Sequence, residues 1–425
     1  MDTHDYANGK FTEDQLEQAI IDMFQEVDER WGYVNGETMH RRFDDVLLED
    51  RLKANLRSRY SGLTLTDTEL VTIVNKIKYV PADPLYEGTR QTFWRINEGF
   101  DLKREEPSLP AAHIEYIDFD NPGANDFLIV NQYSVQGSEL RRPDLLCFVN
   151  GIPLVIWEFK TAIEEDKTVH DAWEQITVRY RRGIPNLLKY CCLAVISDGA
   201  NNRLGTVFTP YRFFYAWNKA DEQDTVRNGI SSLRTMVKGA FTPERLLAIV
   251  RDFVFFPDDD KHETEIVCRY PQFFAANRML DHICAHLRPA GDGKGGTYFG
   301  ATGCGKTYAM LFLARLMMLR RTEELGNPTV VILVDREELD AQTSELFVTA
   351  KHYLHEEDVR SIESREDLGN TLRNRPSGGV YVTTIQKFCE GTGLLSDRPN
   401  IICISDEAHR TQTGVGSRLK MTDEG

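Results

Sequence analysis

The pattern of hydrophobic and polar residues begins with an amphipathic helix over residues 12–30. Its apolar positions recur at helical spacing and are Leu16, Ile20, Phe24 and Val27. Thr12 and Gln15 stand three residues apart at its start, which is the spacing of a capping box. Residues 31–126 contain several prolines and show no clear period, so we expect them to elaborate the first domain.

The period changes at about residue 127, where short apolar runs separated by turn residues predict strands. A helix is expected between the third and fourth of these runs, over residues 168–182. The runs cover residues 127–130, 145–149, 154–157 and 192–196. Asn150-Gly151 predicts a tight hairpin turn between the second and third strands. Together these elements predict a compact mixed α/β core.

A second pattern follows residues 256–261, a turn-prone and charged stretch typical of a linker. Beyond it, strand-like and helical segments alternate, which predicts a doubly wound parallel sheet. The strand-like segments cover residues 297–299, 330–334, 379–383 and 401–404. A chain of 425 residues is too long for one ordinary domain. We expect one domain over residues 1–250, with its core at about 12–30 and 127–217, and another over 251–425.

Composition adds three constraints. The eight cysteines show no zinc spacing or disulfide framework, and no apolar run is long enough to cross a bilayer. The N-terminus lacks the layout of a signal peptide, so we expect a cytoplasmic protein that does not contact membranes. The net charge of −16 is unusual for a DNA-binding enzyme. Local basic clusters decide binding more than net charge does. Arg141, Arg142, Arg179, Arg181, Arg182 and Lys189 are therefore either candidate phosphate-binding residues or ordinary solvated charges, and partner subunits are another source of basic surface.

Asp144, Glu158 and Lys160 form the pattern of a metal-dependent nuclease. Asp144 opens one predicted strand, Glu158 ends the next, and the hairpin between them brings the two carboxylates together. Oxygen ligands suit Mg²⁺, which neutralises phosphate and activates water, so both carboxylates are candidate metal ligands. Lys160 shares the face of Glu158 and is a candidate catalytic residue, as is Glu17 on the first helix.

The short nuclease pattern is not specific by itself, because charged residues at strand ends are more often solvated caps. The ATP-site motifs downstream, which are described next, favour a catalytic role for these residues. Gln175, on the following helix, shares a face with Arg179 in a regular α-helix. That face is expected either to serve the metal site, with Gln175 as a catalytic residue, or to be an exposed polar surface.

A complete phosphate-binding loop stands in the second half of the chain. It consists of Gly300, Ala301, Thr302, Gly303, Cys304, Gly305, Lys306 and Thr307. Its glycines allow backbone N–H groups to approach the phosphates of ATP, Lys306 pairs with the terminal phosphates, and Thr307 is a candidate Mg²⁺ ligand.

A second ATP-site pattern, Asp-Glu-Ala-His, follows the last predicted strand. Asp406 is a candidate Mg²⁺ ligand, Glu407 would polarise the attacking water, and His409 would link the nucleotide to DNA binding. Gln272, ahead of the phosphate loop, is a candidate reader of adenine.

At this point the chain resembles the restriction (motor) subunit of type I restriction-modification enzymes. The nuclease-like block that carries the resemblance comprises Asn131-Gln132, Arg142-Pro143-Asp144, residues 148–154 and Glu158-Phe159-Lys160. Ser197-Asp198-Gly199 and residues 203–206 resemble the stretch that follows that block. The motifs similar to superfamily 2 helicases are Asp335-Arg336, residues 383–388 and residues 406–410.

The resemblance implies a PD-(D/E)xK-type nuclease domain, a mixed sheet flanked by helices, followed by a RecA-like helicase domain. It implies ATP-dependent translocation of double-stranded DNA and Mg²⁺-dependent cleavage of unmodified foreign DNA. Methyltransferase and specificity subunits of the same complex are the implied partners. Because later helicase motifs are not present, we expect an N-terminal fragment that has little ATPase activity alone.

One spacing departs from the family pattern. The family helix has Gln and Tyr four residues apart, whereas Gln175 and Tyr180 are five apart. In a regular α-helix this places Tyr180 about 140° around the helix from Gln175, so we expect Tyr180 to lie away from the site. Two other functions stay open: a stand-alone DNA repair or processing helicase-nuclease, and a nuclease-like domain that docks without cutting.

Overall fold

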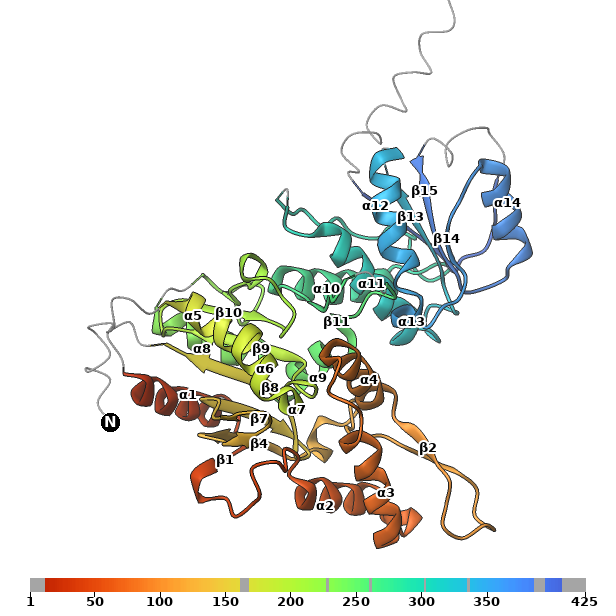
Figure 1. Cartoon of the computed structure of the whole chain (residues 1–425). Helices are drawn as coiled ribbons and strands as arrows, with labels where there is room; N and C mark the ends of the chain where they lie inside the picture. Colours follow the sequence, from red (N-terminus) through yellow and green to blue (C-terminus); the bar gives the residue numbers. More distant parts are fainter. Residues whose placement is uncertain are drawn as a thin grey trace, which may run out of the picture. The chain divides into compact units, whose positions relative to one another are not determined.

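The computed structural model divides into two compact units that are described separately (Figure 1). The first comprises Met1–Val254 and Glu263–Tyr270, and the second comprises Phe255–His262 and Pro271–Gly425. The structure describes residues 12–160, 168–226, 229–259, 262–301, 303–334, 337–385 and 394–406. Within these ranges, no helix is long and apolar enough to cross a membrane.

A six-stranded mixed sheet forms the centre of the first unit, in the order β1-β4-β7-β8-β9-β10. The strands are β1 (Trp31–Asn35), β4 (Phe127–Asn131), β7 (Leu145–Val149), β8 (Ile152–Phe159), β9 (Leu193–Ser197) and β10 (Asn202–Gly205). The pairs β1–β4 and β8–β9 are parallel, and the other neighbours are antiparallel. All residues of β4, β7, β8 and β9 are buried, which explains their nearly continuous apolar sequence.

Helices cover both faces of this sheet. Trp157 of β8 packs edge-on against Phe24 of α1 (Glu13–Val27), with ring centroids 5.7 Å apart. Glu158, the next residue, points to the opposite face, because side chains alternate along a strand. There it contacts the helical segment that begins with α5 (Val169–Glu174). The end of β8 therefore presents polar residues towards the second layer of helices.

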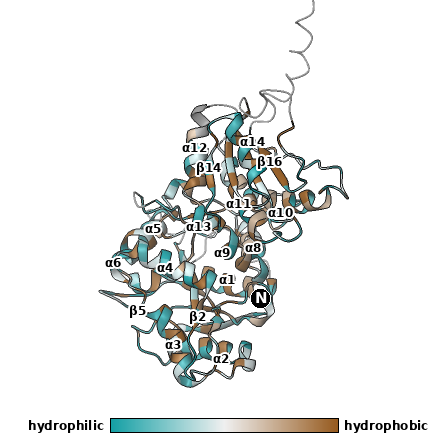
Figure 2. Cartoon of the chain, turned by 90° about the vertical axis from the view of Figure 1, so that its right-hand side faces the viewer, coloured by the Kyte–Doolittle hydropathy of each residue, from teal (hydrophilic) through white to brown (hydrophobic). Residues whose placement is uncertain are grey.

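The remaining elements of the first unit elaborate this core. The helices are α2 (Glu49–Arg59), α3 (Asp67–Lys78), α4 (Leu85–Glu98), α6 (Arg181–Gly183), α7 (Pro185–Leu188), α8 (Ile230–Ala240) and α9 (Pro243–Asp252). Short strands are β2 (Phe100–Leu102), β3 (Ala112–Ile114), β5 (Val135–Gln136), β6 (Leu140–Arg141), β11 (Val254–Phe255) and β12 (Ile266–Val267). Single turns are η2 (Gly36–Thr38), η3 (Ser61–Leu63), η4 (Pro122–Ala124), η5 (Gln175–Tyr180) and η6 (Tyr211–Phe213). The helices carry both hydrophilic and hydrophobic residues, as expected for a surface layer (Figure 2).

The second unit contains a four-stranded parallel sheet in the order β14-β15-β13-β16. Its strands are β13 (Thr329–Val334), β14 (Val359–Ser361), β15 (Val380–Thr384) and β16 (Ile401–Ser405). Its helices are α10 (Tyr270–Ala285), α11 (Lys306–Leu319), α12 (Glu337–Val348), α13 (Lys351–Leu354) and α14 (Arg365–Asn374). A buried cluster that includes Val331, Leu368 and Tyr381 holds α14 on the sheet.

Most of the predicted elements are confirmed. The first helix has the predicted capping box, in which Thr12 and Gln15 bond each other's backbone N–H. Four strands of the first unit (β4, β7, β8 and β9) and the three later predicted strands of the second unit lie where their apolar runs predict, whereas β1 and β10 were not predicted. The strand predicted at residues 297–299 is wrong, because these residues form no strand and Phe299 is 95% exposed. Its apolar run is only three residues long and follows a glycine-rich stretch.

Candidate active sites

Asp144 and Glu158 lie at the same end of two neighbouring strands. Leu145 of β7 pairs with Trp157 of β8, so the register places Asp144 across from Glu158. The backbone N–H of Phe159 donates to Asp144 Oδ2 over 2.6 Å, which ties the loop before β7 to the end of β8. The hairpin at Asn150 has a positive φ of 51°, as a tight turn requires. The two carboxylates predicted as metal ligands are therefore brought together.

Lys160 closes this cluster. Its ammonium donates to Glu158 Oε1 over 2.9 Å and to the main-chain oxygen of Phe159 over 2.7 Å. Glu158 is fully buried, and Lys160 is 8% exposed. The predicted alternation that puts both side chains on one face is confirmed by these contacts. The cluster is held by hydrogen bonds in a place where water screens charge poorly.

The carboxyl groups of this cluster hold their protons unusually tightly. Burial, together with the charge of Glu158, raises the pKa of Asp144 well above its usual range. Burial raises the pKa of Glu158 to about 7, although the Lys160 ammonium acts in the opposite direction. Burial lowers the pKa of Lys160, but the charge and hydrogen bond of Glu158 outweigh it and the net pKa is raised. When all three groups are ionised, the two carboxylates of Asp144 and Glu158 share one ammonium, that of Lys160.

This donor set fits a hard divalent cation. It offers two carboxylates and one main-chain oxygen, and oxygen ligands are what Mg²⁺ prefers. The ammonium of Lys160 already lies against two of these oxygens, which shows that they converge on one positive charge. Among the described residues, no three His, Cys, Asp or Glu side chains form a metal-holding group. The set is therefore limited to Asp144, Glu158 and the carbonyl of Phe159.

The first helix adds acidic side chains to the cluster. Glu17, predicted as catalytic, is 5% exposed and accepts hydrogen bonds from Gln132 over 2.6 Å and from Asn131 over 3.1 Å. Burial raises its pKa, and its charge helps to raise the pKa of Asp144. Glu13, which the sequence reasoning missed, lies 4.0 Å from the Lys160 ammonium. The signal for Glu13 was its position one helical turn before Glu17.

The expectation that Tyr180 lies away from the site is wrong. Residues Gln175–Tyr180 form a π-helical turn rather than a continuation of the α-helix. The Tyr180 hydroxyl accepts a hydrogen bond from Gln175 Nε2 over 2.9 Å and donates to Glu158 Oε2 over 3.0 Å. Gln175 therefore reaches the cluster through Tyr180, whereas Arg179 is exposed. The α-helical period assumed for this segment caused the error.

The predicted basic residues divide into two groups. Arg142 and Arg181 lie on the surface and pair with Glu37 over 2.8 Å and with Glu263 over 2.5 Å. Lys189 is 5% exposed, and its ammonium donates to the main-chain oxygens of Lys78, the last residue of α3, and of Val80. Lys189 thus supports a helix end, and its assignment to a phosphate-binding patch is wrong.

The phosphate loop of the second unit leads directly into a helix. Gly303 and Gly305 have positive φ values of 79° and 83°, which favour glycine, and α11 begins at Lys306. Thr307 lies in the first turn of α11, where free backbone N–H groups favour anions. Gly300, Ala301 and Cys304 complete the described part of the loop, and Thr302 lies outside the described residues.

Gln272 contacts this loop. It is 4% exposed, and its side-chain amide donates to the main-chain oxygens of Cys304 over 3.3 Å and of Gly305 over 3.0 Å. A Cβ atom on Gly305 would overlap that amide. The structure brings Gln272 to the loop, and its role in reading adenine stays a prediction.

Asp406 follows β16 at the carboxyl edge of the parallel sheet. Its backbone N–H donates to Leu333 over 2.8 Å, so it lies beside the end of β13. In doubly wound sheets, ligands bind at this edge. Glu407 and His409 lie outside the described residues.

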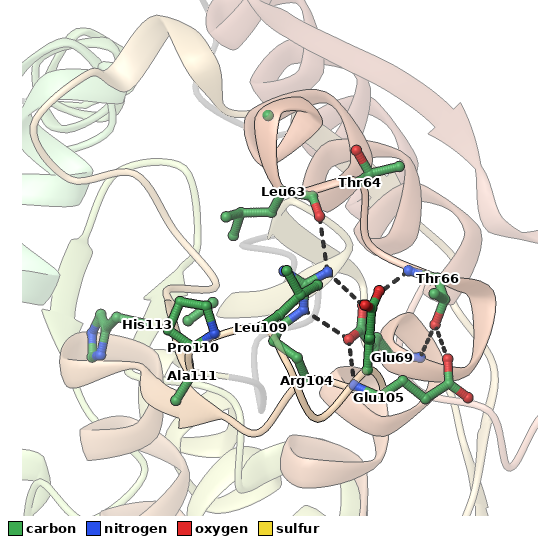
Figure 3. Close-up of a pocket in the computed structure, with 13 residues that line it drawn as sticks. Leu63, Thr64, Thr66, Glu69, Arg104, Glu105, Leu109, Pro110, Ala111 and His113 are labelled. Carbon is green, nitrogen blue, oxygen red and sulfur yellow. Dashed lines mark hydrogen bonds and ion pairs between the residues drawn. The ribbon is translucent and has the colours of Figure 1, made fainter.

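A large open cavity lies elsewhere in the first unit. It has a volume of about 710 Å³ and is lined by residues around Thr66, Leu109 and His113 (Figure 3). On its wall, Arg104 pairs with Glu69 over 2.8 Å, and both side chains are buried. None of the predicted site residues lines it, so the cavity is not part of either candidate site.

Comparisons with known proteins match two separate parts of the chain to two families. Residues 10–213 match the family model described as type I restriction enzyme R protein N terminus, and residues 271–423 match the SWI2/SNF2 ATPase model. The HindI endonuclease subunit of a type I restriction enzyme from Haemophilus influenzae is 33% identical over 316 residues. That alignment covers 72% of this chain and 30% of the relative.

A second relative is aligned over more of the chain. The putative MjaIXP endonuclease subunit of a type I restriction enzyme from Methanocaldococcus jannaschii is 32% identical over 403 residues. That alignment covers 88% of this chain and 37% of the relative. The chain thus spans about a third of the length of these curated relatives.

Proposed function

The chain belongs to the family of type I restriction enzyme endonuclease subunits, and we propose that it cuts double-stranded DNA with Mg²⁺ and moves DNA with ATP. The nuclease domain would comprise residues 1–250 and have the PD-(D/E)xK fold. The motor domain would comprise residues 251–425 and have the RecA-like fold. The observation that carries the proposal is the Lys160 ammonium lying against two oxygens of a buried acidic cluster at the strand ends.

The nuclease roles follow from the contacts of the cluster. Asp144, Glu158 and the main-chain oxygen of Phe159 would hold Mg²⁺. When bound, the ion neutralises charge on the phosphate and activates water for attack. Lys160, released from part of its pairing with Glu158, would donate to the developing negative charge on the phosphate. Glu17, fixed by Asn131 and Gln132, would orient water beside this cluster.

The motor roles rest on the phosphate loop. The backbone N–H groups of the loop and the N-terminus of α11 would bind the phosphates of ATP, and Lys306 would pair with the terminal ones. Thr307 and Asp406 would hold the associated Mg²⁺, and Glu407 would polarise the attacking water. Gln272 would read the adenine, and His409 would link the nucleotide state to DNA binding or to the other half of the motor. We also propose that the chain alone hydrolyses ATP slowly.

The proposed partners would read the DNA sequence. Direct readout of a sequence requires side chains that enter a groove of DNA. We propose that methyltransferase and specificity subunits of the same complex read the sequence. The negative net charge of −16 favours such partners, because they would contribute much of the basic surface that DNA requires.

A cleavage assay tests the nuclease proposal. The complex that contains this chain is mixed with unmethylated plasmid, ATP and Mg²⁺, and linear product is measured over time. Lys160→Ala and Asp144→Ala should each reduce cleavage by at least about 100-fold, because each removes a group that stabilises charge in the transition state. Lys53→Ala, which removes a partly buried ion pair with Glu49, is the control and should cut normally. Unchanged cleavage by both site variants would favour a docking role for the domain.

A further inference from the structure

A single π-turn interrupts the helix that carries Gln175 and Tyr180. The α-helix α5 ends at Glu174, the π-turn covers Gln175–Tyr180, and α6 begins at Arg181. In a π-turn the backbone hydrogen bond joins residues five apart, so these residues adjoin. The bond of 2.9 Å between the Gln175 amide and the Tyr180 hydroxyl confirms that the two side chains meet. Gln175 and Tyr180 are five residues apart, one more than in the family helix, and the wider π-turn therefore accommodates the additional residue.

The local sequence favours this wider turn. Ile176, Thr177 and Val178 are three consecutive β-branched residues, which are poor α-helix formers. The Thr177 hydroxyl donates to the main-chain oxygen of Trp173 over 2.8 Å, a contact that bends helices. Ile176 is fully buried and Tyr180 is 2% exposed, whereas Val178 is 48% exposed. The turn thus directs its apolar and aromatic side chains inwards and leaves Val178 at the surface.

The Tyr180 hydroxyl holds one oxygen of Glu158. A phenol has one proton to donate, and Glu158 Oε2 at 3.0 Å is a nearer acceptor than the main-chain oxygen of Arg142 at 3.4 Å, while Gln175 donates to the phenol oxygen. The other oxygen, Oε1, accepts from Lys160 over 2.9 Å. Each carboxylate oxygen therefore has a different partner, and rotation of the carboxylate would break both contacts.

We infer that Tyr180 is a positioning residue for Glu158 and that the π-turn is the device that places its hydroxyl there. The inference rests on the proposed role of Glu158 as a Mg²⁺ ligand. With Oε2 bonded to Tyr180, Oε1 is the oxygen that would bind the ion once Lys160 releases it. Partners of metal ligands orient the ligand and typically contribute about 10- to 100-fold to metal affinity.

Titration of the full chain with Mg²⁺ alone tests the inference without relying on cleavage. The readout is the urea midpoint of unfolding followed by tryptophan fluorescence, because all five tryptophans lie before residue 255, in the first unit. Tyr180→Phe should raise by about 10- to 100-fold the Mg²⁺ concentration that produces a given increase in the urea midpoint, because this stabilisation depends on the ratio of the Mg²⁺ concentration to Kd. Deletion of Val178 restores a four-residue spacing in an α-helix, and it should leave that concentration within about threefold of wild type. Val178→Ala is the control of unchanged length.

The possible outcomes separate this inference from the proposed function. Glu158→Gln should abolish the Mg²⁺ response, and if it responds like wild type, the metal site and the inference are both wrong. If Glu158→Gln loses the response but Tyr180→Phe keeps it, only the positioning role of Tyr180 is wrong. If the Val178 deletion unfolds the first unit without urea, or weakens the Mg²⁺ response as much as Tyr180→Phe does, the π-turn does not serve to place the Tyr180 hydroxyl at Glu158. Combining the deletion with Tyr180→Phe should reproduce Tyr180→Phe alone.

Discussion

In the absence of divalent cations, the free energy of unfolding of the first unit should fall as the pH rises from about 5 to 8. The pKa of Glu158 is about 7 in the folded protein, against an ordinary value of 4.5. Between these values the folded chain binds a proton that the unfolded chain has lost, so the free energy of unfolding falls with rising pH. The stabilisation is complete below pH 4.5 and is lost as the pH passes through about 7.

The size of the loss follows from the same pKa values. The difference between 4.5 and about 7, at about 1.36 kcal/mol for each pH unit, amounts to about 3 kcal/mol. Asp144 adds to the loss, because burial and the charge of Glu158 raise its pKa in the same direction. Glu69 acts oppositely, since hydrogen bonding to Arg104 lowers its pKa to about 2, but its window lies below pH 4.5. Mg²⁺ should offset the loss most strongly at high pH, because it binds the ionised carboxylates.

The assay is urea unfolding followed by tryptophan fluorescence at several pH values, with chelator or with Mg²⁺. The profile of Glu158→Gln should be flatter than that of wild type by about 3 kcal/mol between pH 5 and 8, because glutamine does not titrate. Glu29→Gln, at an exposed position, is the matched control and should keep the wild-type profile. A wild-type stability in chelator that is constant or rises from pH 5 to 8 would refute the reasoning.

Three further predictions concern groups outside the nuclease cluster. Burial holds the pKa of Glu265 well above its usual range, and hydrogen bonding to Thr206 offsets only part of this effect; Glu265→Met should therefore raise the urea midpoint at pH 8 more than at pH 5, and an equal gain at both would contradict this. Arg104→Met should lower the urea midpoint, because it removes the ion pair of Glu69; the double variant with Glu69→Gln should recover much of that loss, and a double variant as unstable as the single one would count against the pair. Gly303→Ala and Gly305→Ala should each weaken binding of a fluorescent ATP analogue, because a positive φ strains alanine by about 1–2 kcal/mol. Gly305→Ala should be the worse variant, since its Cβ also overlaps Gln272 whereas the space around Gly303 is open; equal losses would exclude that overlap as a cause.

The candidate sites were predictable where their signal is local in the sequence. The phosphate loop is a contiguous motif, and the positive φ values of Gly303 and Gly305 follow from its glycines. Asp144 and Glu158 were predictable as neighbours because a two-residue hairpin joins the strands that carry them. The β-bulge between Cys147 and Phe148, which shifts the register by one residue and places Asp144 across from Glu158, was not predictable in this way. The capping box of the first helix is likewise a pattern over four residues.

Other features were missed because their cause is not local. The strand Trp31–Asn35 has no fully buried residue after Trp31, and it becomes part of the sheet by pairing with β4. Residues 297–299 have a strand-like sequence, yet they form no strand. β-structure depends on pairing with a neighbouring strand more than on the propensity of a short segment. The sequence did not show that residues 31–35 have such a neighbour and that residues 297–299 form no strand.

The sequence by itself determined the chemical groups, their order along the chain and the strands that carry most of them, because apolar period and turn residues act over short distances. Only the tertiary structure decided which of these groups meet. It buried Glu158 between Lys160 and Tyr180, and it gave the helix a π-turn where a regular period would have turned Tyr180 away. The physical reason is that contacts between separate elements outweigh the small differences in free energy between one helical turn and another.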